Sequence, residues 1–493
     1  MLRKLVTFRG PYKILNLAWM AFFLTFVVWF SYAPFATTIA QDLSLSPGQS
    51  KTITLCNLAL TIPARIIMGM VLDRFGPRIT YSGLLIFSAF PTLAFAMAQD
   101  FNQLVISRLL LGIVGAGFVV GIRLVAEWIP EKQIGIAQGI YGGWGNFGSF
   151  GSNALLPIVA ASTAFLSAGQ VNWRFAIGST GVIAALFGIL FYFNVENTPP
   201  GKVYQRPAKS GGMEVTSARS FFGLLLVNLP IFLAMGLIDW RLKEAGLIVP
   251  NVMVGLWGLF GLLYGVQCYQ AWKVNQEVVA RKKHYEKGDR YAMTQVFLLG
   301  LAYVASFGSE LAVVSMLPTF FANTFGLDYT QAGLSAASYP LINLFGRPVG
   351  GWICDNSGSR KWTLTLLLAG VGLGHLITSQ INASWSLPLA IVTLMFSAFF
   401  TCAGSGATFG IAPLLQRRVT GQIAGIVGAY GSVGAVFYAV IYAALPSTPL
   451  GNTQFFQYLG VTSIVTAFLC GFCLKEPTIK GAVAEEAVVV LGS

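Results

Sequence analysis

One segment of the chain occurs twice, and this duplication limits the folds that the sequence can adopt. From position 65 to position 78 the sequence has Arg, Gly, Asp, Gly and Arg in that order, and the same residues recur 282 positions later. A repeat at a fixed spacing indicates a duplicated structural unit. We therefore expect two halves of similar fold, and the shared residues are the first candidates for function. They are Arg65, Gly69, Asp73, Gly76, Arg78 and Arg347, Gly351, Asp355, Gly358, Arg360.

The composition places these halves in a membrane. Of the 493 residues 55% are hydrophobic and 10% are charged, and the mean hydropathy is +0.69, whereas soluble domains have roughly 25% charged residues. The net charge of +13 would suit nucleic acid, but most of the 31 lysines and arginines fall in segments that we assign to one side. That distribution is the positive-inside bias of membrane proteins. We expect an all-α, multi-pass protein of the inner or plasma membrane with both termini cytoplasmic, membrane lipid around it, and no nucleic-acid partner.

Apolar stretches long enough to span a bilayer, about 20 residues each, divide the chain. Six lie in residues 1–200, which we predict to be an N-terminal six-helix bundle, and six in residues 291–477, a C-terminal bundle. Residues 478–493 are expected to be a flexible cytoplasmic tail. The first stretch follows basic residues and runs on at full spanning length, which favours an uncleaved span over a signal peptide. The twelve stretches lie near 14–38, 52–72, 79–98, 103–125, 134–160, 172–193, 292–321, 331–353, 362–380, 386–414, 420–445 and 455–474.

The middle of the chain, residues 201–290, contains two further apolar segments near 221–238 and 246–271. We expect a cytoplasmic linker with an inserted transmembrane hairpin at 221–271, giving about 14 spans. Because Asn228 and Pro230 interrupt the first segment, a single re-entrant element is the alternative. Either arrangement has an even number of crossings, so both copies of the repeated turn face the basic side.

The chain offers little for metal or redox chemistry. It has two histidines, and its six cysteines lie mostly in apolar stretches, where cysteine behaves as a small buried hydrophobe. We expect no metal site and no cofactor. The sequence also has no Gly-x-x-x-x-Gly-Lys-Ser/Thr loop, so we do not expect ATP to drive the protein directly.

The most unusual shared residues are Arg65 and Arg347, each inside an apolar helix. An arginine at the bilayer centre costs roughly 2.5–3.5 kcal/mol on insertion scales. Two of them facing one cavity would repel each other unless an anion lay between them. The alternative is that each pairs with a carboxylate or with backbone carbonyls in its own half. Glu310 is the one acid that we place deep in a span, and it would balance at most one arginine. A planar guanidinium fork suits a small planar oxyanion.

Glu310 is also a candidate proton carrier, because a buried carboxyl can take up and release a proton. An ion pair that fixes helix packing is the equally weighted alternative.

Glycines recur every third residue in two helical stretches. The first contains Gly139, Gly142, Gly145 and Gly148, and the second contains Gly425, Gly428, Gly431 and Gly434. Small residues at this spacing let helix backbones approach closely. A match from Gln133 to Gln422 and from Tyr141 to Tyr430 relates the stretches at a spacing of 289. Asn146, a carboxamide in this apolar setting, needs a polar partner, and a ligand in the cavity is a natural one.

These motifs resemble a known family. The turn Gly-x-x-x-Asp-x-x-Gly-x-Arg, present in both halves, resembles the signature loop of the major facilitator superfamily. The sequence Gly-Gly-Trp-Gly-Asn-Phe-Gly at 142–148 resembles the first signature of its nitrate/nitrite porter family, and 428–435 resembles the second. The resemblance implies two six-helix bundles related by a pseudo-two-fold axis. It also implies a set of substrate-binding residues: Arg65, Arg347, Asn146, Tyr303, Phe307, Phe118 and Gly142.

The resemblance changes how other residues are interpreted. Tyr303 and Phe307 share a helix face and would otherwise be core or lipid-facing residues, but in this family they line the cavity. Arg108 resembles the arginine of the superfamily's fourth-span motif, which implies a conformational or structural role. The inner turns, Asp73, Arg74, Arg78, Asp355 and Arg360, are expected to hold helices together in one state of an alternating-access cycle, with a solvated loop as the alternative.

The sequence thus predicts a monomeric secondary transporter for nitrate, with nitrite as a further substrate, coupled to protons or exchanging one anion for the other. A facilitator for another small anion or an organic acid is the second hypothesis. A membrane-embedded enzyme or a sensor is the third, but the chain shows neither a clustered catalytic constellation nor a large soluble domain.

Overall fold

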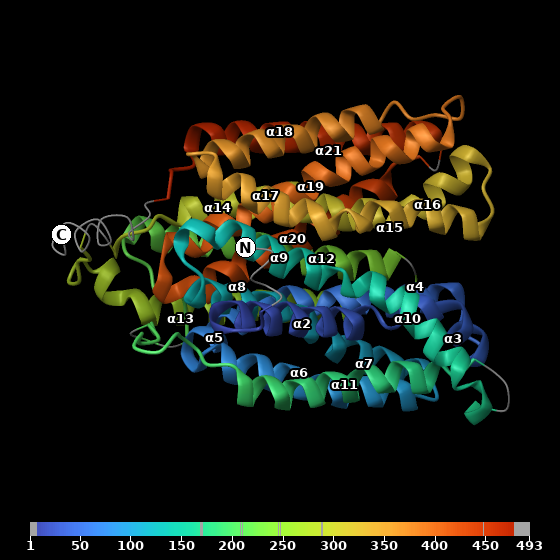
Figure 1. Ribbon diagram of the computed structural model, residues 1–493, viewed down its shortest axis with the longest axis horizontal. Coiled ribbons are helices and arrows are strands. Elements are labelled where there is room, and N and C mark those ends of the chain that lie inside the picture. Colours follow the sequence, from blue (N-terminus) through green and yellow to red (C-terminus); the bar gives the residue numbers. More distant parts are fainter. Residues whose placement is uncertain are drawn as a thin grey trace.

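The computed structural model describes residues 7–477 except 168–170, 208, 210, 245, 247, 287–288 and 447. Every regular element in these residues is a helix (Figure 1), which confirms the all-α prediction. The predicted tail at 478–493 lies outside the described residues.

The N-terminal helices pack together in the lower part of Figure 1, and the helices after residue 290 pack in its upper part. Residues 10–194 form α2 (Gly10–Phe30), α3 (Ala36–Asp42), α4 (Pro47–Ala59), α5 (Thr61–Phe75), α6 (Pro77–Met97), α7 (Phe101–Gly112), α8 (Gly117–Trp128), α9 (Ile134–Asn146), α10 (Gly148–Ser162) and α11 (Trp173–Asn194). Residues 293–473 form α14 (Met293–Tyr303), α15 (Ser309–Phe325), α16 (Tyr329–Leu341), α17 (Asn343–Asn356), α18 (Arg360–Thr378), α19 (Leu387–Leu415), α20 (Thr420–Ala444) and α21 (Pro449–Cys473). Short turns of 3-10 helix, η1 (Ala33–Phe35), η2 (Ile113–Ala116), η3 (Glu131–Gln133), η4 (Ala164–Ser167) and η7 (Arg417–Val419), and a π-helical turn, η6 (Val304–Gly308), connect some of them.

Eleven helical stretches among the described residues are long and apolar enough to cross a membrane. Three other stretches, α4–α5, α9–α10 and α16–α17, are interrupted near their middles at Leu60, Phe147 and Ile342. Proline contributes to two of these interruptions. Pro63 lies in the first turn of α5, and Pro340 lies at the end of α16, where its missing N–H and its ring disfavour a continuous helix.

Several helices of the two halves pack against each other, and two helix pairs make the most extensive of these contacts. α5 packs on α20 and α17 packs on α9. Glycines make the approach possible, since a β-carbon at Gly139 would lie 2.7 Å from the Cα of Pro348, and one at Gly425 would lie 2.6 Å from the Arg65 carbonyl oxygen. Both distances are shorter than real β-carbon contacts, so any larger residue would separate the helices. These two pairs place Arg65 and Arg347 in the centre of the molecule.

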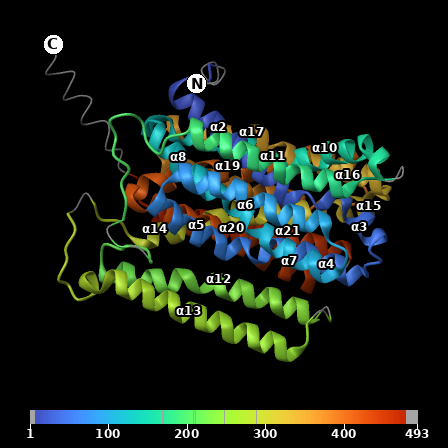
Figure 2. The same ribbon diagram turned by 90° about the horizontal axis from the view of Figure 1, so that it is seen from below.

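The central segment forms a hairpin of two long helices, α12 (Ala218–Glu244) and α13 (Pro250–Val279). Figure 2 shows the hairpin beside the other helices, with α13 outermost. α12 packs on α14 and α20, and the Tyr430 hydroxyl of α20 donates a hydrogen bond to the Val227 carbonyl (2.8 Å). The most apolar 18-residue window of α13 contains no buried residue.

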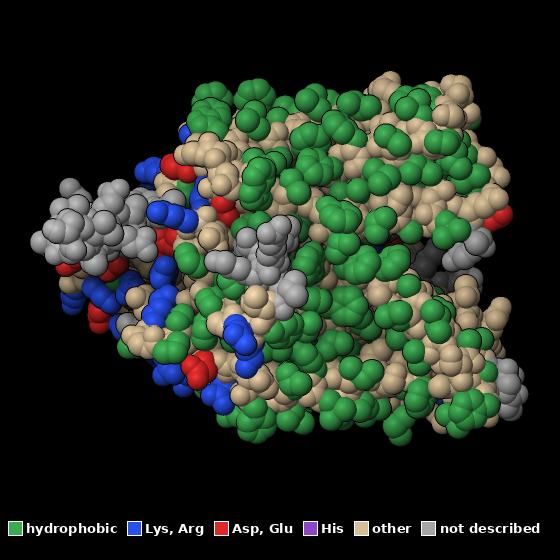
Figure 3. All heavy atoms as spheres, in the orientation of Figure 1, with side chains coloured by type: hydrophobic (Ala, Val, Ile, Leu, Met, Phe, Trp, Pro, Cys, Tyr) green, Lys and Arg blue, Asp and Glu red, His purple; other side chains and the backbone are tan. Residues whose placement is uncertain are grey.

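Lysine and arginine side chains gather at one end of the molecule, while the rest of the visible surface is largely hydrophobic (Figure 3). We call this the basic end. The described residues of the linkers before and after the hairpin, at 195–217 and 280–292, lie at this end (Figure 2).

Candidate functional site

Arg65 and Arg347 come together around one aromatic ring. Arg65, on α5, is 0% exposed and Arg347, on α17, is 1% exposed. The guanidinium carbons lie 5.5 Å and 5.2 Å, respectively, from the centroid of the Phe307 ring. A ring face attracts cations, so this arrangement stabilises two positive groups that would otherwise repel each other.

Arg347 is balanced within its own half. Its Nη2 lies 3.0 Å from Glu310 Oε2, and both side chains are buried. Asn343, four residues earlier on α17, links the pair: its Oδ1 accepts from Arg347 Nε (2.7 Å), and its Nδ2 donates to Glu310 Oε1 (2.6 Å). The three side chains form a closed hydrogen-bonded set, which is how a buried ion pair avoids leaving polar atoms unpaired.

Arg65 has no such balance. Its Nη1 donates to the Gly428 carbonyl oxygen of α20, and its Nε has no hydrogen-bond partner. No carboxylate of the described residues lies within ion-pair distance of Arg65, which leaves a net positive charge in this buried site.

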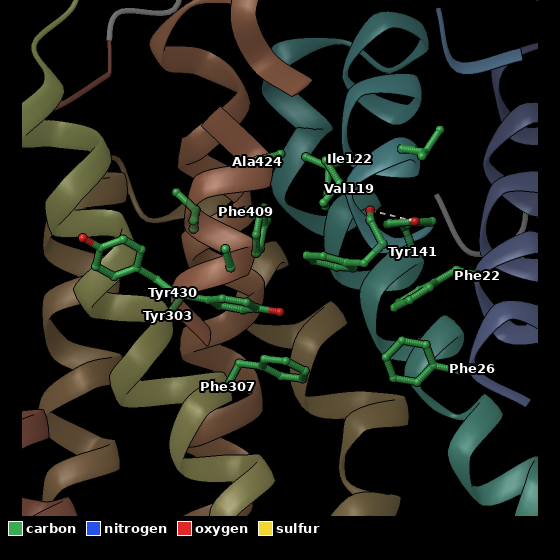
Figure 4. Packing of buried hydrophobic residues seen from close by; sticks show 14 of the residues in the cluster. Phe22, Phe26, Val119, Ile122, Tyr141, Tyr303, Phe307, Phe409, Ala424 and Tyr430 are labelled. Atoms are coloured by element: carbon green, nitrogen blue, oxygen red, sulfur yellow. Dashed lines mark hydrogen bonds between the residues drawn. The ribbon is translucent and has the colours of Figure 1, made fainter. Parts of the chain in front are cut away.

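Aromatic rings pack beside the arginines, and Figure 4 shows Tyr303, Phe307 and Phe409 close together among the buried hydrophobic side chains. The Tyr303 ring is stacked with Phe307 (centroids 4.9 Å apart) and with Phe118 (6.1 Å). Phe409 of α19 meets Tyr303 and Phe118 edge-on at 4.9 Å and 4.8 Å. Phe307 lies in the π-helical turn η6, three residues before Glu310, and such turns often occur at functional sites. Because these rings are mostly apolar, few other polar groups lie beside the arginines to compete with a ligand for their N–H donors.

The two glycine-containing stretches, which we call the glycine stripes, run from Gly139 to Gly148 and from Gly425 to Gly434. Each stripe packs against the arginine of the other half. A β-carbon at Gly142 would lie 3.5 Å from Arg347 Nη1, and one at Gly428 would lie 3.6 Å from Arg65 Cδ. Gly145 and Gly431 likewise face rings, those of Phe22 and of Tyr303 with Phe307.

In these contacts, each glycine of the first stretch corresponds to the glycine 286 positions later in the second. The spacing of 289 inferred from the sequence match is therefore wrong as an alignment of the two stretches in the structure. Glycines at every third position allow an alignment to slip by three, and the contacts decide between the two registers. Gly148 and Gly434, at the same spacing of 286, both pack on the first helix of a half, against Phe26 and Val304.

In this register Asn146 corresponds to Ser432. Both side chains are buried, and neither Asn146 amide atom nor Ser432 Oγ has a hydrogen-bond partner. Each lies four residues after a glycine that faces an arginine, Gly142 and Gly428, and therefore on the same helix face. Buried polar groups without partners are costly, so both are suited to a polar ligand.

The two aspartates of the repeated motif join the two halves near the basic end. Asp73 accepts hydrogen bonds from the backbone N–H groups of Gly421 and Gln422, both at 2.9 Å. Asp355 accepts from Gly135 (2.9 Å) and Ile136 (2.8 Å). Each carboxylate therefore caps the first turn of a helix in the opposite half, where unpaired N–H groups and the helix dipole favour an anion.

The motif arginines have different surroundings. Arg360 forms an ion pair with Asp355 (2.9 Å) and donates to the Glu131 carbonyl (2.7 Å). Arg78 instead donates to the Tyr192 carbonyl (2.7 Å) within the N-terminal half, and the Arg74 guanidinium lies 5.2 Å from the Phe75 ring. A role for these residues in gating stays a prediction.

Arg123 on α8 is the partner of Asp73, at 2.9 Å, and it also contacts Glu127 and the carbonyl of Gln205. The linker covers this group, since the Tyr204 ring lies 4.7 Å from Arg123 and its hydroxyl donates to the Leu72 carbonyl. Burial raises the pKa of the Tyr204 phenol, so it remains a protonated donor.

Sequence reasoning did not single out four residues of this arrangement: Asn343, Phe409, Arg123 and Ser432. For Asn343 a signal existed, because it lies one helical turn before Arg347 in an apolar stretch. For Arg123, the signal was a buried charge with a carboxylate, Glu127, four residues later. Phe409 and Ser432 became recognisable only from the helix packing.

A comparison with protein-family models matches the chain to the Major Facilitator Superfamily over residues 18–272 and 299–490. The chain is 53% identical over 486 residues to the nitrate/nitrite transporter NrtP of Nostoc punctiforme, covering 98% of this chain and 96% of that protein. It is 50% identical to the protein of the same name from Picosynechococcus, with the same coverage of both chains.

Among solved structures, the fold is similar to that of the proton:xylose symporter XylE bound to 6-bromo-6-deoxy-D-glucose. The TM-score is 0.61 at 14% identity, and the match covers 97% of this chain and 98% of that one. At this identity the likeness concerns the fold alone. The extent of the family match and the identity to two nitrate/nitrite transporters lead to one conclusion: the chain belongs to the nitrate/nitrite porter family of the major facilitator superfamily.

Proposed function

We propose that the chain is a secondary transporter that carries nitrate, and nitrite as a second substrate, across the cytoplasmic membrane, with the anion bound between Arg65 and Arg347. The observation that carries the proposal is the unequal balance of the two arginines. Glu310 neutralises Arg347, and Arg65 has no carboxylate within ion-pair distance in the described part of the chain. One excess positive charge matches one monovalent anion.

The surroundings of the arginines favour a small planar anion. Guanidinium groups present paired N–H donors to a planar oxyanion. The Tyr303, Phe307 and Phe118 rings limit the space, while Asn146 and Ser432 offer buried polar atoms that lack partners. Gly142 leaves room beside Arg347. The two relatives at 50% identity or more are both named nitrate/nitrite transporters, which supports the same substrates for this chain.

We further propose alternating access between two six-helix bundles related by a pseudo-two-fold axis, residues 1–200 and 291–477, with the hairpin of residues 201–290 between them. The eleven candidate spans of the described residues, together with the three interrupted stretches, would account for the 14 crossings that we propose. Asp73 and Asp355 hold the basic end closed by capping helices across the halves, assisted by Arg360 and, at the same end, by Arg74 and Arg78. We place the basic end in the cytoplasm, together with both termini, and propose that the monomer is the transporting unit.

Coupling to protons follows from the membrane potential. A potential that is negative inside opposes anion entry by about 2.3 kcal/mol per charge per 100 mV, so net uptake needs a co-transported cation or an exchanged anion. We propose proton symport with Glu310 as the carrier, because its carboxylate holds Arg347 and would release it on protonation. Exchange of nitrate for internal nitrite is the alternative.

Proteoliposomes of purified protein test the proposal. Nitrate is supplied outside at a fixed potential, with either an inward proton gradient or internal nitrite. Uptake driven by the proton gradient alone would establish symport, and uptake that requires internal nitrite would establish exchange. Absence of nitrate flux under both conditions, with folded protein, would refute nitrate transport and favour another small anion or an organic acid.

A further inference from the structure

Arg108 is a third buried arginine that the proposed site does not use. It lies on α7 and is 3% exposed. Its Nε and Nη1 are buried without any hydrogen-bond partner, and no carboxylate of the described residues lies within ion-pair distance of it. The family resemblance implies a conformational or structural role for Arg108. That role alone does not explain why two of its N–H donors are buried without a hydrogen-bond partner.

The groups around Arg108 are neutral and polar. Its guanidinium carbon lies 5.4 Å from the centroid of the Tyr32 ring, which follows α2. The Ser50 side chain lies close enough to the Tyr32 hydroxyl to interact with it. Cys56 of α4 is the other nearby titratable group.

The position of Arg108 relates it to the path of the anion. The α7 helix begins at Phe101, at the end opposite the basic end, and continues through η2 into α8, which contains Phe118 of the proposed site. Ten residues of helix separate Arg108 from Phe118, a rise of about 15 Å. Arg108 therefore lies between the extracytoplasmic end and the level of Arg65.

A buried guanidinium requires a counter-charge or a full set of acceptors, because an unpaired buried charge is strongly destabilising. The described neighbours provide an aromatic face, hydroxyl groups and a thiol, but no negative charge. A small anion would supply both the charge and the acceptors, and the Tyr32 hydroxyl can donate to it as well.

We propose that Arg108 and Tyr32 form a second, outer anion site, which holds a small monovalent oxyanion on its way to Arg65 and Arg347. The inference rests on the proposed function, since it assumes that such anions enter from this end. It assigns Arg108 to the transport path, where a ligand compensates its charge.

Equilibrium binding of isotopically labelled nitrate to the purified, full-length protein tests this site, with nitrate raised to saturation. We expect two nitrate ions per wild-type molecule, one for Arg108→Gln and one for Arg65→Gln. Arg174→Gln is the matched control. Arg174 lies at the same end of the molecule, but it is partly exposed and is already bound to Asp42 and to two backbone carbonyls. This variant should keep both ions.

The outcomes separate the two proposals. A single ion in the wild type that persists in Arg108→Gln overturns the outer site and leaves the central one intact. An unchanged stoichiometry in Arg65→Gln overturns the central site instead. If Arg108→Gln does not fold, crystals of the wild-type protein soaked in bromide decide the question by anomalous scattering. A bromide peak beside Arg108 supports the site, and a water molecule there in its place overturns it.

Discussion

The two arginines of the repeated motif differ in one respect that decides the chemistry of the site. Arg347 is held by Glu310 and Asn343, whereas Arg65 has a backbone carbonyl and an unpartnered Nε. The duplication made the two positions alike in sequence. The unequal partners make one of them part of an ion pair and leave the other without a carboxylate partner among the described residues.

Arg65→Lys tests the role of the guanidinium. An ammonium group keeps the charge but lacks the planar fork that can bind the Gly428 carbonyl and an oxyanion together. We expect nitrate affinity to fall roughly 10- to 100-fold, as for loss of one charge-assisted hydrogen bond, in a protein that still folds. Arg347→Lys should have a comparable effect. Arg174→Lys, at an exposed ion pair, is the control, and wild-type uptake by Arg65→Lys or Arg347→Lys would refute the two-arginine site.

Glu310→Gln separates anion binding from coupling. Glutamine can still accept from Asn343 Nδ2, but it cannot neutralise Arg347 or carry a proton. We expect nitrate binding and nitrate–nitrate exchange to continue, while proton-driven accumulation is lost. Asp239→Asn, a change at a buried acid of the hairpin, should leave accumulation intact. Accumulation by Glu310→Gln at the wild-type level would reduce Glu310 to a packing role.

At the scale of the elements, the interrupted helices and the caps determine how the halves meet. α5 and α17 each begin shortly before their arginine, and each ends near the aspartate that caps a helix of the other half. One helix thus connects the centre of the molecule to the closure of the basic end. Movement of either helix would therefore change the surroundings of its arginine and the contacts at the basic end at the same time.

Asp73→Asn weakens this closure. Asparagine has one acceptor oxygen in place of two and loses the ion pair with Arg123. Removal of such a cap costs about 1 kcal/mol, and loss of the buried charge pair adds to this. We expect the basic end to open more often, which spin-label distances between α8 and α20 would measure. Asp42→Asn, at the opposite end, is the control, and an unchanged distance distribution in Asp73→Asn would contradict the cap's role.

At the scale of the whole molecule, the hairpin of α12 and α13 stands apart from the site. Every residue of the proposed anion site belongs to helices outside it, although Tyr430 and α14 contact α12. The linkers at its two ends also meet, because Thr216 Oγ1 donates to the Tyr291 carbonyl (2.9 Å). Removal of the hairpin should therefore leave Thr216 and Tyr291 close together.

A variant in which a short Gly/Ser linker replaces residues 218–290 tests this separation. We expect it to bind nitrate, since the arginines and the aromatic rings remain, and to melt several degrees lower, because surface of α14 and α20 loses its cover. Tm and nitrate binding of the purified variant are the measurements. A folded variant without nitrate binding would show that the hairpin shapes the site.

The sequence by itself determined the class of fold and indicated the principal residues of the proposed site. Hydrophobic stretches of spanning length predict transmembrane helices directly. In a bilayer the polar backbone groups must form hydrogen bonds within the segment, and a helix allows this. The repeat identified Arg65 and Arg347, since an arginine in an apolar helix is rare without a function. These signals are local, and each can be read from a few neighbouring residues.

Only the tertiary structure decided which groups meet across the chain. It paired Glu310 with Arg347 and left Arg65 without a carboxylate within ion-pair distance in the described residues. It set the register of the glycine stripes at 286, brought Phe409 against Tyr303, and joined Asp73 to Arg123 and to the start of α20. These contacts join residues far apart in the sequence, and they depend on which helix faces pack together. A period of three residues cannot specify that choice, because several registers bury the same glycines equally well.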